Sequence, residues 1–154
     1  MSLQIGEKAP AFCLPSSTGN EVSLSSLSGK KVVLFFYPKD DTPGCVKEAC
    51  GFRDSIDGFN EQDISLFGVS ADGLESHDKF ISKYSLNFPL LSDEEKVMSS
   101  TYGAWGEKVS YGKKSIGMKR MTFLINESGV LVKIWRNVSP EGHAEEVLQV
   151  ISEL

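Results

Sequence analysis

The strongest hydrophobic pattern is an uninterrupted apolar run at residues 32–37, long enough for one strand buried on both faces. Apolar residues at helical spacing follow it and predict a helix over about 43–59, with Pro43 in the first turn, where its missing N–H costs nothing. Residues 64–70 predict a second core strand. In this strand–helix–strand order, the loop at 38–45 leaves the carboxyl edge of the sheet, where open α/β folds bind ligands.

The rest of the pattern predicts an N-terminal hairpin at about 12–24, a helix at 74–84 and a short strand at 88–92. Another helix follows at about 94–102, then a second hairpin at 122–135 and a final helix from 139–141 onward. Residues 103–119 contain four glycines and four lysines without periodicity, so we expect a long loop there. A loop of this length inside a compact domain usually serves a function.

This order of elements is typical of a thioredoxin-like α/β fold. We expect a mixed central sheet flanked by helices, with parallel pairing around the first helix, antiparallel pairing in the late hairpin, and an extra N-terminal β-hairpin. The chain contains no internal repeat, low-complexity tract or linker. We therefore expect a single domain over residues 1–154.

Composition narrows the classes of function. The net charge is −5, from 16 basic and 21 acidic residues, and no basic run of four or more occurs, so nucleic acid and anionic membranes are not expected partners. The first thirty residues lack a signal-peptide pattern, and no apolar stretch is long enough to span a bilayer. We expect a soluble, cytoplasmic protein. Three cysteines are too few for a disulfide scaffold and point to catalytic, metal-binding or inert thiols.

Cys45 is the strongest candidate for a reactive group. It lies in the first turn of the predicted helix, directly after the loop at 38–44. Unpaired backbone N–H groups and the positive end of the helix dipole at this place favour thiolate over thiol. Thr42 adds a hydroxyl, and Pro38 and Pro43 stiffen the loop. The sequence therefore predicts a nucleophilic cysteine.

An arginine from elsewhere in the chain would complete this site, because guanidinium offers fixed donors and a permanent charge. Arg53 is roughly 12 Å of helical rise away from Cys45, which is too far. Arg136 ends the outer strand of the late hairpin, whereas Arg120 stands just before its first strand and is the better candidate. Glu48, one turn after Cys45, is placed either to orient that arginine or to lie on a solvated helix face.

The pattern Pro38-x-x-x-Thr42-x-x-Cys45 resembles the active-site signature of the peroxiredoxins. Residues 37–50 resemble the bacterioferritin comigratory protein, or peroxiredoxin Q, branch of that family. The likeness covers nearly the whole chain, with further matches at 6–10, 52–54, 102–103, 120–125 and 142–144. It implies a thiol-dependent peroxidase of thioredoxin-like fold, without a metal, flavin or nucleotide cofactor.

The resemblance also assigns roles to residues. The peroxidatic cysteine corresponds to Cys45, the resolving cysteine to Cys50, and the site proline, threonine and arginine to Pro38, Thr42 and Arg120. Thr42, Arg120 and the loop around Pro38 and Gly44 are expected to bind the hydroperoxide. One departure is Val46, where this branch commonly has threonine; it leaves the chemistry intact and bears on substrate preference.

The expected mechanism begins with attack of the Cys45 thiolate on hydrogen peroxide or an alkyl hydroperoxide, which leaves a sulfenic acid that Cys50 converts to a disulfide. On an intact helix, Cα atoms five residues apart are roughly 8.6 Å from each other, beyond the roughly 7 Å limit for a disulfide. The first helical turns must therefore unwind in each cycle. By resemblance, thioredoxin, or else glutaredoxin, reduces the disulfide, and the protein is expected to be a monomer.

Some residues carry alternative interpretations. Cys50 lies on the apolar stripe and could be a plain core residue, in which case Cys13 would become the resolving cysteine; Cys13 is otherwise expected to be inert packing. Thr42 could simply cap the helix. We expect His77 and His143 to be surface or capping residues, with no zinc site.

Two other functions use the same cysteines. A thiol–disulfide oxidoreductase normally needs Cys-x-x-Cys at the helix start, and here the third residue after Cys45 is Glu48. A redox sensor or holdase would use the same sulfenic acid to change its binding surface. Trp105 is expected to flank the pocket or a partner surface, and Trp135 to pack in the core.

Overall fold

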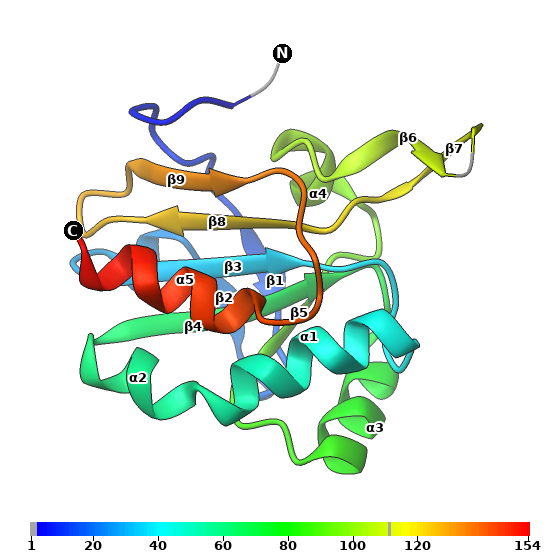
Figure 1. Ribbon diagram of the computed structural model, residues 1–154, viewed down its shortest axis with the longest axis horizontal. Coiled ribbons are helices and arrows are strands. Elements are labelled where there is room, and N and C mark those ends of the chain that lie inside the picture. Colours follow the sequence, from blue (N-terminus) through cyan, green and yellow to red (C-terminus); the bar gives the residue numbers. More distant parts are fainter. Residues whose placement is uncertain (1–2, 111) are drawn as a thin grey trace.

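A five-stranded mixed sheet forms the centre of the molecule (Figure 1). The structure, a computed structural model, describes residues 3–110 and 112–154. In spatial order the strands are β5 (Leu90–Ser92), β4 (Ile64–Ser70), β3 (Lys31–Phe36), β8 (Met121–Ile125) and β9 (Leu131–Trp135). The first three run parallel, and β8 and β9 add antiparallel pairs on the other side of β3. The expected mixed sheet is therefore confirmed.

The two faces of β3 build two separate cores, because successive side chains of a strand point to opposite faces. Val33 and Phe35 face one cluster, which helices α1 (Pro43–Asp54), α2 (Ile56–Glu61), α3 (Leu74–Tyr84) and α5 (His143–Ser152) cover. Val32, Leu34 and Phe36 face the other, under α4 (Val97–Thr101) and the N-terminal segment. Since both faces are covered, β3 reads as an unbroken apolar run, as the sequence indicated.

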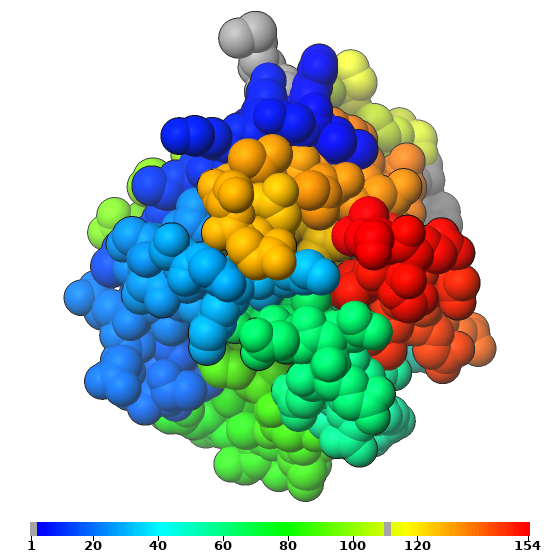
Figure 2. Space-filling model, turned by 90° about the vertical axis from the view of Figure 1, so that its left-hand side faces the viewer, coloured from blue at the N-terminus to red at the C-terminus, as the bar shows by residue number. Residues whose placement is uncertain are grey.

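The N-terminal hairpin is also confirmed. It consists of β1 (Cys13–Pro15) and β2 (Glu21–Ser23), paired antiparallel, and a short 3₁₀ helix at Ser25–Leu27 leads from it toward β3. At the end of the sheet where β3 starts, this region, the β8–β9 turn, α2 and the C-terminal end of α5 form a rounded surface (Figure 2). In the described part of the chain, no helix is both long enough and apolar enough to cross a bilayer.

The expected loop at 103–119 is wrong. These residues form an antiparallel hairpin, β6 (Trp105–Ser110) and β7 (Lys113–Met118), which projects from the body of the molecule (Figure 1); residue 111 lies outside the described residues. The outer part of the hairpin leaves Val109 and Ile116 exposed, and only Met118 of β7 is buried. A strand pair without a buried face lacks the alternation from which strands are recognised.

Three helix boundaries also differ from the expectation. The predicted helix over 43–59 ends at Asp54, and α2 continues its apolar stripe after a break at Ser55. The helix expected near 94–102 is limited to α4. The final helix starts at His143 instead of near 139–141, because Gly142 precedes it with φ 75°, a left-handed conformation that favours glycine. The expected position of Pro43, at the first turn of α1, is confirmed.

Gly68 in β4 offers a test of how tightly the α1 side of the sheet is packed. A Cβ at this residue would lie 2.7 Å from Leu90 Cδ2 and 2.8 Å from Phe35 Cζ. We expect Gly68→Ala to lower the free energy of unfolding by about 1–3 kcal/mol, measured by urea denaturation, because an extra methyl group overpacks the core. Gly106→Ala is the matched control, since a Cβ there meets no atom within 4 Å. Equal effects of both substitutions would contradict this packing.

Candidate active site

Cys45 lies in the first turn of α1, where the loop that leaves β3 enters the helix. Its thiol is free and its side chain is buried. The Sγ atom accepts a hydrogen bond from Arg120 Nη1 at 3.5 Å. The structure thus places Cys45 at the carboxyl edge of the parallel strands, as the sequence predicted, with a cation directly beside the sulfur.

Arg120 reaches Cys45 because of the strand order. It directly precedes β8, and the antiparallel register that pairs Phe36 with Met121 brings the start of β8 beside the end of β3. The same guanidinium atom donates a hydrogen bond to Glu48 Oε1 at 2.8 Å. Of the two interpretations of Glu48, the structure favours the one in which it orients the arginine, because its side chain is fully buried.

Burial dominates the electrostatics of this ion pair. It raises the pKa of Glu48 to about 7, against the opposing effect of the hydrogen bond and charge of Arg120. Glu48 Oε2 has no hydrogen-bond partner among the described residues, which fits a carboxyl group that is costly to ionise. At Arg120, burial lowers the pKa, but the hydrogen bond that it donates to Glu48 and the electrostatic interactions with Cys45 and Glu48 outweigh this effect and raise the pKa overall. Arg120 therefore stays charged.

Thr42 belongs to the loop instead of capping the helix with its side chain. Its Oγ1 donates to the carbonyl of Lys39 at 2.9 Å, and it makes no capping bond to the described part of α1. The capping interpretation is therefore wrong for the side chain, although the Thr42 carbonyl accepts the N–H of Val46 at 2.8 Å. The contact with Lys39 fixes the hydroxyl near the start of α1.

Gly44 allows the guanidinium to approach the loop. A Cβ at this position would lie 2.9 Å from Arg120 Nη2, so a side chain here would displace the arginine. The sequence predicted Gly44 as part of a substrate-binding loop because it directly precedes Cys45. The close approach of Arg120 adds a steric reason for glycine at this position.

A cavity of about 1300 Å³ opens beside Arg120. Pro38, Tyr102, Trp105 and Val138 are among its lining residues, whereas Cys45 does not line it. Of the two expectations for Trp105, a place beside a pocket or on a partner surface, the structure agrees with the first. The cavity leaves room for a molecule larger than hydrogen peroxide next to the guanidinium.

The other two cysteines lie in different settings. Cys50 is partly buried in the same continuous helix as Cys45, and both thiols are free. Cys13 is exposed in β1, so the expectation that it is packed in the interior is wrong. In a short strand of a two-stranded sheet, one face is left uncovered. The alternation of polar and apolar residues in such a strand does not reveal whether Cys13 lies on the covered or the uncovered face.

The expectation of surface histidines is wrong. His77 and His143 are both fully buried and hydrogen-bonded. His143 contacts Thr122 Oγ1 at 2.7 Å and Glu146 Oε1 at 2.9 Å, and burial lowers its pKa. Trp135 packs its ring against His143, in agreement with its expected core role. Among the described residues, no group of three or more His, Cys, Asp or Glu could hold a metal ion.

The other two arginines, Arg53 and Arg136, make their hydrogen bonds away from the Cys45 sulfur. Arg53 donates to the carbonyl of Tyr84 at 2.6 Å, and Arg136 donates to the carbonyl of Leu3 and lines the cavity. Sequence reasoning missed Asp40, which is buried in the loop ahead of Thr42. The available signal was an acidic residue in the short loop between a buried strand and the helix that carries Cys45.

Comparison with known proteins places this arrangement in a family. The model of the AhpC/TSA family matches residues 5–134. The chain belongs to the AhpC/TSA family. The peroxiredoxin Bcp of Bacillus subtilis is 45% identical over 154 residues, which cover 100% of this chain and 98% of the relative. The peroxiredoxin Bcp of Escherichia coli is 38% identical, with 98% and 97% covered.

Solved structures agree with this assignment. A mutant of PrxQ from Xylella fastidiosa superimposes with a TM-score of 0.92 at 34% identity, covering 99% of this chain and 98% of the other. A structure of the bacterioferritin comigratory protein of Xanthomonas campestris gives 0.87 at 36% identity, with 92% and 90% covered. The resemblance of the active-site motif to the peroxiredoxin Q branch and the thioredoxin-like fold are thus confirmed.

The raised pKa of Glu48 predicts a pH-dependent stability. A carboxyl group with a pKa near 7 in the folded state and 4.5 in the unfolded state stabilises the fold below pH 4.5 and loses this contribution as the pH rises through 7. Relative to Glu48→Gln, the wild type should therefore lose on the order of 3 kcal/mol of unfolding free energy over this range. Urea denaturation of both proteins at several pH values measures the difference.

Glu75→Gln serves as the control, because Glu75 is exposed on α3. A difference between wild type and Glu48→Gln that stays constant from pH 4.5 to 7 would contradict the raised pKa of Glu48.

Proposed function

We propose that this peroxiredoxin reduces hydrogen peroxide and organic hydroperoxides at Cys45. The observation that carries the proposal is the buried sulfur at the start of α1, 3.5 Å from the Arg120 guanidinium. Positive charge and helix N–H groups at this point stabilise a thiolate, which is the nucleophilic form of cysteine.

In the proposed reaction, the Cys45 thiolate attacks the nearer peroxide oxygen, and the O–O bond breaks. The bonding electrons leave on the distal oxygen, which takes a proton and departs as water or an alcohol, while Cys45 becomes a sulfenic acid. Arg120, the Thr42 hydroxyl and the backbone N–H groups at the start of α1 hold the peroxide and stabilise the charge on the leaving oxygen. Pro38 and Gly44 shape the loop around it.

Organic hydroperoxides fit the site for a steric reason. The cavity of about 1300 Å³ next to Arg120 has apolar side chains in its wall, among them Trp105, Met118 and Val138. Arg120 lines this cavity and also contacts the Cys45 sulfur, so the alkyl group of a peroxide held by the guanidinium has room to extend into this space. The bacterioferritin comigratory protein of Xanthomonas campestris is described as having alkyl peroxide reduction activity, which supports this part of the proposal.

Cys50 is proposed to resolve the sulfenic acid. Both cysteines lie in α1, where regular geometry puts their Cα atoms roughly 8.6 Å apart, so the helix has to unwind before a disulfide forms. Gly44 and Gly51 make that step easier, because each glycine destabilises a helix by about 1 kcal/mol relative to alanine. A thioredoxin-type dithiol, or a glutaredoxin, then reduces the exposed disulfide. We place this cycle in a cytoplasmic monomer.

Cysteine variants test the proposed roles. Cys45→Ser should reduce peroxide-dependent NADPH oxidation, followed with thioredoxin and its reductase, to the background rate, because no nucleophile remains. Cys50→Ser should still consume one peroxide per Cys45 but form no intramolecular disulfide, as mass spectrometry will report. Cys13→Ser is the matched control and should keep both properties. Stoichiometric oxidation of the wild type without turnover would contradict the peroxidase and favour a redox sensor.

Hydrogen exchange tests the unwinding. On oxidation, amide protection should fall across residues 43–52, because the disulfide cannot form within the intact helix. Amides of β3 and β4 should keep their protection and serve as the internal control. Equal protection of α1 in reduced protein and in protein with a verified Cys45–Cys50 disulfide would contradict the proposed movement.

A further inference from the structure

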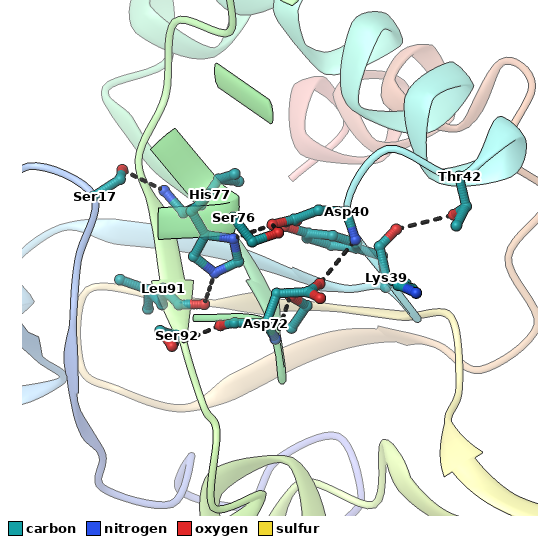
Figure 3. Close-up of polar contacts among 12 residues, drawn as sticks. Ser17, Lys39, Asp40, Thr42, Asp72, Ser76, His77, Leu91 and Ser92 are labelled. Atoms are coloured by element: carbon teal, nitrogen blue, oxygen red, sulfur yellow. Dashed lines mark hydrogen bonds and ion pairs between the residues drawn. The ribbon is translucent and has the colours of Figure 1, made fainter. Parts of the chain in front are cut away.

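A buried cluster of polar side chains lies next to the loop that carries Thr42 (Figure 3). Its centre is Asp40, whose carboxylate is only 3% exposed. The peroxide chemistry proposed above does not use this cluster. Its contacts connect the loop to strands and helices on the α3 side of the molecule.

Both carboxyl oxygens and the backbone N–H of Asp40 make hydrogen bonds. Its Oδ1 accepts the Tyr37 hydroxyl at 2.6 Å, and its Oδ2 accepts the Ser76 hydroxyl at 2.8 Å and contacts His77 Nδ1 at 2.7 Å. Its backbone N–H donates to Asp72 Oδ2 at 2.8 Å. Tyr37 ends the β3 region, Ser76 and His77 belong to α3, and Asp72 follows β4, so this one residue ties the loop to three parts of the fold.

The partners of His77 engage both of its ring nitrogens. Its Nε2 faces the carbonyl oxygen of Leu91 at 3.0 Å, and because a carbonyl only accepts, Nε2 must carry a proton. Its Nδ1 lies 2.7 Å from Asp40 Oδ2, which also accepts the Ser76 hydroxyl. Within residues 3–110 and 112–154, His77 is the only basic side chain in contact with Asp40. The fully buried ring is thus fixed between the Asp40 carboxyl group and the Leu91 carbonyl.

The loop next to this pair is held in a fixed and uncommon conformation. Asp41 has φ 58°, in the left-handed region, and its exposed side chain contacts Lys83 Nζ at 2.9 Å and the Tyr84 hydroxyl at 2.7 Å. Both aspartates thus attach the loop to α3, the buried one firmly and the exposed one through solvent-screened contacts. Thr42 follows immediately.

We propose that His77 is a positioning residue for the peroxide reaction. It acts through Asp40: the imidazole ring holds the Asp40 carboxyl group, this group holds the loop, and the loop sets the place of the Thr42 hydroxyl and of the first N–H groups of α1. This role rests on the proposed function of Cys45. It also makes α3 the fixed side of the site while α1 unwinds.

Two substitutions separate the two ring nitrogens. An asparagine amide can place a donor near the position of Nδ1, toward Asp40, and a glutamine amide near that of Nε2, toward Leu91. We expect His77→Gln to slow the reaction of the reduced protein with hydrogen peroxide by roughly tenfold, since small misplacements of catalytic groups cost this much or more. His77→Asn should recover most of the rate. Lys79→Gln, exposed on the same helix, is the control and should react like the wild type.

The rate constant is measured by stopped-flow tryptophan fluorescence on protein whose folding is checked by circular dichroism and urea denaturation. A folded His77→Gln that is less stable but reacts at the wild-type rate would reduce His77 to a structural residue and overturn the proposal. So would an equal loss of rate in both variants. A wild type that does not react with peroxide would contradict the function of Cys45 itself, and the positioning role with it.

The contacts of the His77 ring are tested in the wild type by nitrogen NMR of isotopically labelled protein. The chain has two histidines, so a variant of His143 assigns the signals. The Nε2 atom of His77 should show a shift of the protonated type, because it faces the Leu91 carbonyl. An unprotonated Nε2 would overturn the orientation of the ring on which the proposal rests.

Discussion

The Arg120 guanidinium lies 3.5 Å from the Cys45 sulfur and 2.8 Å from the Glu48 carboxylate. A cation at this distance favours the thiolate that the proposed reaction needs, and the glutamate restricts the directions in which the cation can point. This contact depends on the order of the strands, since the start of β8 must lie beside the end of β3 for the arginine to arrive there. It also depends on α1 remaining a helix, because Cys45 and Glu48 share a face only at helical spacing.

In the proposed cycle the same helix has to meet an opposite demand. Attack on peroxide uses α1 intact, whereas a disulfide between Cys45 and Cys50 would need it unwound. Toward the sheet, α1 buries Ala49 and Phe52, and the ring of Phe52 stacks on Phe35. Toward α5 and the segment before it, the contacts at its glycines involve small groups: a Cβ at Gly51 would lie 3.9 Å from the Ala144 Cβ, and one at Gly44 3.5 Å from Pro140 Cγ.

The sequence predicted the reactive centre better than its surroundings. Cys45 and Thr42 were found because a local motif fixes a strand, a loop and a helix start, whereas Arg120 was chosen from its place just before a strand and from the resemblance to the peroxiredoxins. The hairpin β6–β7 could not be found, since its exposed strands show no alternation. His77 was also missed, because its burial depends on Asp40, 37 residues away. A single polar side chain carries no local sign of a distant partner.

The buried polar cluster and the helix that has to unwind are complementary in the proposed cycle. Leaving a buried hydrogen-bonding group without its partner typically costs about 1–3 kcal/mol, so a loop attached through Asp40 and His77 resists displacement. The helix that begins two residues after Asp41 has glycines at 44 and 51. If its first turns unwind while the loop keeps its attachment, Cys45 can leave its site for Cys50 and return to the same position, because the loop that defines the site has not moved.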